Sequence, residues 1–145
     1  MPGVPDAEGL RLATPLLMTA IVVTAAVVER DGRFLVTRRQ KGVHLEGYWE
    51  FPGGKCDGDE SLTACLTREL REELDVGATV GSEIFTTTHA YPERSVELHF
   101  LRCTIDREPR SILGQEIRWV ARADLASLEF PPADAELIVK LVNTP

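Results

Sequence analysis

The stretch that decides the fold is residues 49–76, which read WEFPGGKCDGDESLTACLTRELREELDV. It begins with strand-forming residues that end at Pro52 and two glycines, and it continues into a helix predicted over residues 61–74 with Ser61 as its N-cap. Four leucines spaced one turn apart form an apolar stripe along this helix: Leu62, Leu66, Leu70 and Leu74. The pattern predicts a strand, a glycine turn and a helix that packs on a sheet.

Three glutamates share one arc of the predicted helix. Glu69, Glu72 and Glu73 are spaced i, i+3 and i+4, and two of them border the apolar stripe. Like charges one turn apart repel by roughly a few tenths of a kcal/mol, and a hard divalent cation with oxygen ligands neutralises such a cluster well. For the helix alone, a solvated charged face with Arg68 and Arg71 paired to glutamates remains the alternative.

The residues before the helix favour metal binding over that alternative. Gly53 and Gly54 lie between strand and helix, where the lack of a side chain lets a ligand approach the backbone closely. Glu60 stands at the helix entrance. Together these residues predict one preorganised pocket for metal and phosphate.

The rest of the chain predicts a β-rich single domain. Strands are expected at 18–29, 34–38, 84–89, 96–104 and 117–120, with a hairpin turn at Asp31-Gly32, a helical turn at 122–127 and a last helix near 133–142. Residues 1–15 are expected to form a flexible N-terminal tail and residues 16–145 the domain. This mixture indicates an α+β or α/β sandwich.

Charge and composition argue against several other classes. The 145 residues carry a net charge of −7, which opposes binding to polymeric nucleic acid but allows small phosphorylated ligands bridged by metal ions. The uncharged run at 12–28 contains Pro15 and falls short of the roughly 20 residues of a membrane span, so we expect a buried strand and no membrane contact. The three cysteines form no CxxC pair, which predicts reduced thiols in a cytoplasmic protein, with Cys65 a packed small side chain.

Residues 54–76 resemble the Nudix box, through Gly54, Glu60 and the run Arg68-Glu69-Leu70-x-Glu72-Glu73-x-x-Val76. The flanking segments 37–39, 49–54, 91–94 and 130–134 resemble the MutT branch, so the similarity covers roughly residues 18–142. The resemblance implies the Nudix fold, a mixed β-sheet packed between helices. Asp75 stands where the family usually has glycine. Aspartate tolerates the left-handed conformation, so a modest stability cost with intact metal ligands is expected.

The resemblance also implies an activity, the Mg²⁺-dependent hydrolysis of nucleoside triphosphates to a monophosphate and pyrophosphate, with Mn²⁺ as a substitute metal. The implied metal ligands are the Gly53 carbonyl, Glu69, Glu72 and Glu73. Glu69 is the expected general base, and Arg68 is expected to orient the glutamates by charge-assisted hydrogen bonds. Support of the loop or of the outer metal shell is expected from Gly54, Glu60 and Glu116. The last is included because Leu113 stands where MutT relatives often have another metal-binding glutamate.

Substrate contacts are expected from Arg39, Glu50, Phe51, Arg94 and Asp134. Asp134 falls where relatives recognise the base: ionised, it accepts from the amino group of cytosine, and protonated, it serves a purine. Both 8-oxo-dGTP and (modified) dCTP or CTP therefore stay open. The alternatives are a helix N-terminal charge for Asp134, a core role for Phe51, and solvated positions for the two arginines. Three histidines without metal-ligand spacing are expected in structural or surface roles: His44, His89 and His99.

Two other functions remain open from the sequence. One is a Nudix hydrolase for another nucleoside diphosphate derivative, such as ADP-ribose or a nucleotide sugar. The other is a non-catalytic Nudix-fold binding module, which should have lost its glutamates. The expected role is sanitation of the nucleotide pool by a monomer or homodimer acting on a small-molecule nucleotide.

Overall fold

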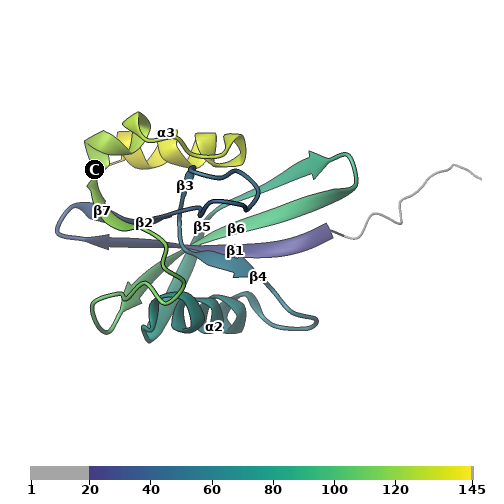
Figure 1. Cartoon of the computed structure of the whole chain (residues 1–145), viewed down its shortest axis with the longest axis horizontal. Helices are drawn as coiled ribbons and strands as arrows, with labels where there is room; N and C mark the ends of the chain where they lie inside the picture. Colours follow the sequence, from purple (N-terminus) through teal and green to yellow (C-terminus); the bar gives the residue numbers. More distant parts are fainter. Residues whose placement is uncertain (1–19, 145) are drawn as a thin grey trace, which may run out of the picture.

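The computed structural model describes residues 20–144 and shows a mixed β-sheet between helices (Figure 1). The described strands are β1 (Ala20–Arg30), β2 (Arg33–Arg38), β3 (Trp49–Glu50), β4 (Gly53–Lys55), β5 (Ala78–Tyr91), β6 (Arg94–Ile105) and β7 (Ile117–Ala121). The described helices are α2 (Leu62–Leu74), the 3₁₀ turns η1 (Arg122–Ser127) and η2 (Pro132–Asp134), and α3 (Ala135–Asn143). The tail predicted at 1–15 lies outside the described residues.

Strand β1 is the centre of the sheet. It pairs in parallel with β6 from Ala20↔Ser95 to Val28↔Cys103, and antiparallel with β4 on its other side. At its end it turns into β2 through Asp31 and Gly32, whose φ values of 53° and 76° are the positive pair that a tight hairpin needs. The predicted hairpin is therefore confirmed, and the strand order is β3-β2-β1-β6-β5 with β4 on β1 and β7 on β2.

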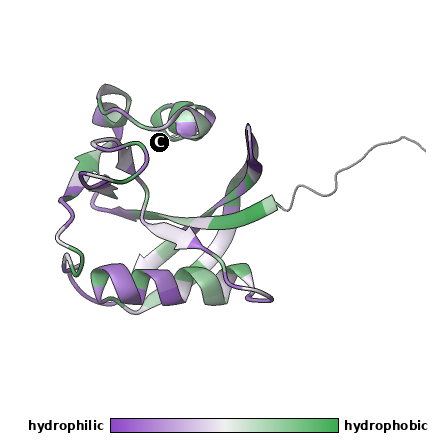
Figure 2. Cartoon of the chain, turned by 45° about the vertical axis from the view of Figure 1, so that its right-hand side comes forward, coloured by the Kyte–Doolittle hydropathy of each residue, from purple (hydrophilic) through white to green (hydrophobic). Residues whose placement is uncertain are grey.

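The two helices cover opposite faces of this sheet (Figures 1 and 2). Because side chains alternate along β1, Ala26 and Val28 pack against the leucines of α2, while Ala25 and Val27 join the cluster that includes the buried residues of α3. The buried residues of α2 include Leu66, Leu70 and Leu74 of the predicted leucine stripe, and those of α3 are Leu137, Ile138 and Leu141. The predicted mixed-sheet sandwich is confirmed.

Both ends of α2 are closed by the expected residues. The Ala64 backbone N–H donates to Ser61 Oγ at 3.1 Å, which is the N-cap interaction. Asp75 adopts the left-handed conformation at φ 56°, and its N–H donates to the Arg71 carbonyl at 3.1 Å. The Asp75 carboxylate also accepts from Arg110 at 2.8 Å, so the aspartate in the usual glycine position gains an ion pair. The prediction that aspartate tolerates this position is confirmed.

Two sequence-based expectations need correction. The strands expected at 84–89 and 96–104 are the middle of the longer β5–β6 hairpin, which runs from Ala78 to Ile105. The expectation of reduced thiols is wrong for Cys56 and Cys65, which form a disulfide, whereas Cys103 is buried and free. The two half-cystines are nine residues apart in sequence, but the loop before α2 folds back and brings their Cα atoms to 5.2 Å. Within residues 20–144, no helix is long and apolar enough to cross a membrane.

Candidate active site

Most of the predicted site residues line one open cavity of about 850 Å³. Its walls come from β1, the β2–β3 loop, β4, α2, η2 and the β5–β6 hairpin with its turn. The predicted residues that line it are Arg39, Glu50, Phe51, Gly53, Gly54, Glu69, Glu73, Arg94 and Asp134. Residues separated by about 95 positions in sequence thus share one cavity, as the resemblance implied.

The two glycines are required by close approach at the start of this cavity. A Cβ on Gly53 would lie 2.0 Å from the Thr24 carbonyl oxygen, because β4 runs directly beside β1. A Cβ on Gly54 would lie 2.4 Å from Glu69 Oε1. The missing side chain at Gly54 is therefore the space that the Glu69 carboxylate occupies.

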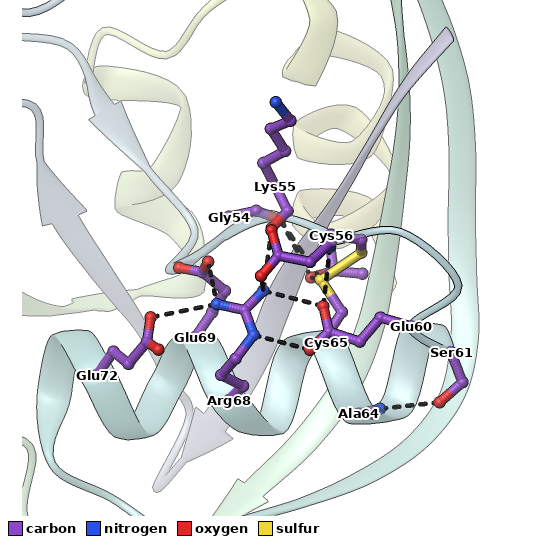
Figure 3. Close-up of polar contacts among 12 residues, drawn as sticks. Gly54, Lys55, Cys56, Glu60, Ser61, Ala64, Cys65, Arg68, Glu69 and Glu72 are labelled. Atoms are coloured by element: carbon purple, nitrogen blue, oxygen red, sulfur yellow. Dashed lines mark hydrogen bonds and ion pairs between the residues drawn. A yellow bond between two sulfur atoms is a disulfide. The ribbon is translucent and has the colours of Figure 1, made fainter.

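Arg68 forms hydrogen bonds to several carboxylates beside the Gly53-Gly54 turn and so fixes their orientation (Figure 3). Its guanidinium donates to both Glu60 oxygens at 2.7 and 3.0 Å, to Glu69 Oε2 at 2.9 Å and to Glu72 Oε1 at 3.2 Å. It also donates to the Lys55 carbonyl at 3.1 Å. The hydrogen bonds from Arg68 hold the pKa of Glu60 at about 2. The orienting role that was expected for Arg68 matches this geometry.

The carboxylates in the cavity repel one another strongly. Burial, together with the neighbouring carboxylates of Glu69, Glu50 and Glu72, raises the pKa of Glu73 to about 9. The pKa of Glu50 is also raised by burial, against the opposing effect of Arg39. Buried like charges of this kind are stabilised when a divalent cation binds between them, so the carboxylate oxygens and the backbone carbonyl of Gly53 form a donor set that fits a hard metal ion.

Arg39 forms hydrogen bonds to Glu50 in the cavity and to the backbone of the β2–β3 loop. Its Nη1 donates to Glu50 Oε1 at 2.9 Å, and its Nε donates to the His44 carbonyl at 2.5 Å. Arg39 therefore holds the β2–β3 loop over the cavity instead of lying in solvent. The expectation of a site role is favoured over a solvated strand-end arginine.

Asp134 is a buried carboxyl group in the lining of the cavity. It is 5% exposed, it stands at the junction of η2 and α3, and its side chain makes no capping hydrogen bond to α3. Burial, together with the Glu50 charge, raises the pKa of Asp134 to about 7. Helix capping therefore does not explain this carboxyl group, which faces the cavity in a state where both protonation forms are populated near neutral pH.

Aromatic side chains also line the cavity. Phe51 is buried, stacks on Phe130 with ring centroids 5.3 Å apart and an interplanar angle of 20°, and also lines the cavity, so it serves the core and the site together. Tyr91 meets His89 at 4.6 Å and His44 at 5.9 Å, both edge to face. The two histidines were expected in structural or surface roles, but both line the cavity. Their position depends on the long hairpin and on the β2–β3 loop, which local patterns did not place.

Four predicted residues lie outside the cavity lining: Glu60, Arg68, Glu72 and Glu116. Glu60 and Glu72 contact Arg68 on the outer side of α2, which suits loop support for Glu60. Glu116 pairs with Arg118 at 2.9 Å and with Arg38 at 3.5 Å on the surface, so the outer metal role expected for it has no geometric support. The residue that sequence reasoning missed is Gln115, whose buried side chain donates to the Glu73 carbonyl at 3.3 Å and ties the loop before β7 to the end of α2.

A family model described as a NUDIX domain matches residues 23–140, and the chain belongs to the Nudix family of hydrolases. Its relatives include a putative 8-oxo-dGTP diphosphatase 2 of Mycobacterium tuberculosis H37Rv, 36% identical over 139 residues and covering 88% of this chain and 92% of that protein. The CTP pyrophosphohydrolase of Escherichia coli K12 is 44% identical over 82 residues, which are 57% of this chain and 61% of that protein.

The fold is likewise similar to solved structures. The solution structure of the E. coli ORF135 protein matches with a TM-score of 0.78 at 35% identity, covering 86% of this chain and 91% of that one. Membership of this family indicates a divalent-metal requirement, in agreement with the carboxylate cluster of α2. The chain is thus a Nudix hydrolase in which Glu69 and Glu73 of α2 line an open cavity.

Proposed function

We propose that this Nudix hydrolase cleaves nucleoside triphosphates to a nucleoside monophosphate and pyrophosphate, with Mg²⁺ as the metal and Mn²⁺ as a substitute. The observation that carries the proposal is the cavity itself, which is lined by Glu69, Glu73 and Gly53 and also by the buried Asp134. In this proposal the triphosphate binds beside the glutamates and the base binds beside Asp134. The relatives named for 8-oxo-dGTP and CTP hydrolysis support this substrate class.

The ligand set at the phosphate end would be Glu69, Glu72 and Glu73 with the Gly53 carbonyl. When bound there, a divalent cation supplies Lewis-acid polarisation of the phosphates and lowers the pKa of water. Glu69 is the proposed general base: Arg68 holds its Oε2, which leaves the carboxylate oriented against Gly54 to accept a proton from the attacking water. Attack at the β-phosphorus releases pyrophosphate.

Cationic side chains would bind the phosphates from the opposite side. Arg39 and Arg94 both line the cavity, and Arg39 is already oriented by its ion pair with Glu50. Their charges offset the carboxylates across the cavity.

At the base end, Asp134 sets the choice of substrate. With a pKa of about 7, its carboxyl group accepts from the cytosine amino group when ionised and donates to a purine acceptor when protonated. The proposed substrates are accordingly 8-oxo-dGTP and the (modified) cytidine triphosphates, consistent with sanitation of the nucleotide pool. The proposal includes a cytoplasmic setting, free nucleotides instead of polymeric nucleic acid, and a monomer or homodimer.

The test is pyrophosphate release with Mg²⁺ from 8-oxo-dGTP, dGTP, dCTP, 5-methyl-dCTP, CTP, dATP, ADP-ribose and a nucleotide sugar. We expect turnover of a triphosphate with pyrophosphate as product. Glu73→Gln should abolish that turnover, whereas Glu136→Gln, the same change on the exposed face of α3, should leave it unaltered. Turnover confined to ADP-ribose or the nucleotide sugar, with a sugar phosphate as product, would replace the proposed substrate class. No turnover of any compound would indicate a binding module.

A further inference from the structure

Two cysteines of the Nudix box are joined across the loop between β4 and α2. Cys56 follows β4 directly, Cys65 lies one turn into α2, and their sulfur atoms are bonded (Figure 3). We call residues 56–61 the β4–α2 loop. The bridge fastens this loop, and with it the glycine turn that precedes it, to the helix that carries the metal-binding glutamates.

The buried end of the bridge contacts the backbone of the active site. Cys65 is fully buried, and its Sγ lies 3.3 Å from Thr24 Oγ1 and 3.8 Å from the Gly54 carbonyl oxygen. The buried Thr24 hydroxyl also lies 3.4 Å from that carbonyl oxygen. Gly54 in turn sets the space for the Glu69 carboxylate. Oxidation or reduction of Cys65 can therefore change the position of Glu69, the proposed general base, through the intervening Gly54.

The other end of the bridge is open to reagents. Cys56 is half-buried, whereas Cys65 has no exposed surface, so an external thiol reaches Cys56 Sγ and displaces Cys65. Two contacts of the loop do not involve the bridge: the Cys56 N–H donates to the Val22 carbonyl at 2.9 Å, and Glu60 binds Arg68. These contacts should hold the loop in place after reduction, so that the bridge can form again.

We propose that Cys56 and Cys65 form a reversible redox site that sets how firmly the β4–α2 loop positions the metal-binding carboxylates. This inference rests on the proposed function, because it concerns regulation of that same site. In the oxidising direction, the Cys56 thiolate attacks a low-molecular-weight disulfide and expels one thiolate. The Cys65 thiolate then attacks Cys56 Sγ, closes the bridge and expels the second, so the small disulfide takes both electrons and both protons.

The bridged form is the more active form. Opening the bridge removes a cross-link between residues nine apart in sequence, which should lower the thermal midpoint by roughly 8 °C. It should also weaken divalent-metal affinity by roughly tenfold, the lower end of what loss of an outer support costs a metal site. The fall in turnover should follow metal affinity and be recovered in part at high Mg²⁺.

The experiment compares the full chain in two states, air-oxidised and reduced with the reductant removed under argon. Mn²⁺ affinity by electron paramagnetic resonance, the thermal midpoint and pyrophosphate release are measured on each, and thiol titration counts the bridge. Cys56→Ser should behave like the reduced wild type in both states. Cys103→Ala, which removes the one free cysteine of residues 20–144, should keep the redox response.

The outcomes separate this inference from the proposed function. A redox shift in Mn²⁺ affinity and thermal midpoint without hydrolysis of any triphosphate would uphold the redox site and overturn the substrate class. Equal metal affinity and equal turnover in the two states, with the bridge present in only one, would overturn the redox site and leave the function standing. The absence of a bridge after air oxidation would also overturn it.

Discussion

Replacing Gly54 by alanine tests the central contact of the site. The new Cβ would lie 2.4 Å from Glu69 Oε1, whereas an ordinary contact is 3.4 Å, so the carboxylate must retreat by about 1 Å. A displacement of that size in a catalytic group costs about 100-fold in rate, or about 2.7 kcal/mol of transition-state stabilisation. The obstacle is the end of a flexible side chain, so the backbone should tolerate the change.

The assay measures kcat/KM for pyrophosphate release together with the thermal midpoint. We expect Gly54→Ala to lower kcat/KM by about 100-fold while the thermal midpoint moves by no more than about 3 °C. Mn²⁺ affinity should weaken as well, since Glu69 is a proposed ligand. Activity lost only through unfolding would appear as a lowered midpoint instead.

Gly77→Ala is the matched control. Its Cβ would lie 2.6 Å from an oxygen of the Asp106 carboxylate, which is the same kind of collision away from the cavity. It should leave kcat/KM within about threefold of the wild type. If Gly54→Ala stays within that range too, or if Gly77→Ala is as damaging, the steric reasoning about Glu69 is refuted.

Four further predictions concern charge and capping. Because the pKa of Asp134 is raised to about 7, the folded state holds its proton more tightly, so this group stabilises the fold below about pH 4 and that stability is lost as the pH rises through about 7. The thermal midpoint of Asp134→Asn should therefore gain on the wild type across this range, and parallel curves would contradict the burial argument. Because the pKa of Glu73 is raised to about 9, this residue must release a proton when a cation binds. Mg²⁺ affinity should therefore rise by up to tenfold per pH unit between about pH 7 and 9. Calorimetry in buffers of different ionisation enthalpy measures both the affinity and the proton release. Arg68→Lys cannot reproduce the forked contacts and should lower kcat/KM by roughly 10- to 100-fold, and a smaller loss would show that a point charge suffices. Ser61→Ala removes the N-cap of α2 and should cost about 1 kcal/mol in denaturant unfolding with unchanged kcat.

Local patterns predicted the parts of the structure that depend on neighbours in sequence. The Asp31-Gly32 turn, the Ser61 cap and the leucine stripe of α2 each follow from contacts within a few residues, and each is present. The shared arc of Glu69, Glu72 and Glu73 follows from helix geometry alone, because the three positions are spaced i, i+3 and i+4 on α2. Family resemblance then placed Asp134 and Arg39 in the same cavity, which no local pattern could have done.

The features that were missed all depend on distant segments. The bridge between Cys56 and Cys65 forms because β1 fixes the loop on one side and α2 on the other, and a nine-residue spacing alone gives no signal of it. His44 and His89 reach the cavity from a loop and from the end of the β5–β6 hairpin, whose length the sequence pattern understated. Glu116 shows the opposite error, because proximity in sequence to the expected position did not bring its side chain to the metal end.

The buried carboxyl groups of the cavity explain why several independent contacts are needed to hold the site together. Glu50, Glu73 and Asp134 all have pKa values raised by burial, so the cavity is a place where the folded state holds carboxyl groups at a cost to stability. Arg68 of α2 forms hydrogen bonds to Glu60, and Arg39 forms a hydrogen bond to the backbone of the β2–β3 loop. The buried bridge and the capped ends of α2 add constraints that do not depend on charge. Binding of the proposed cation beside these carboxyl groups would lower that cost, and metal and substrate binding would then add to the stability of the fold.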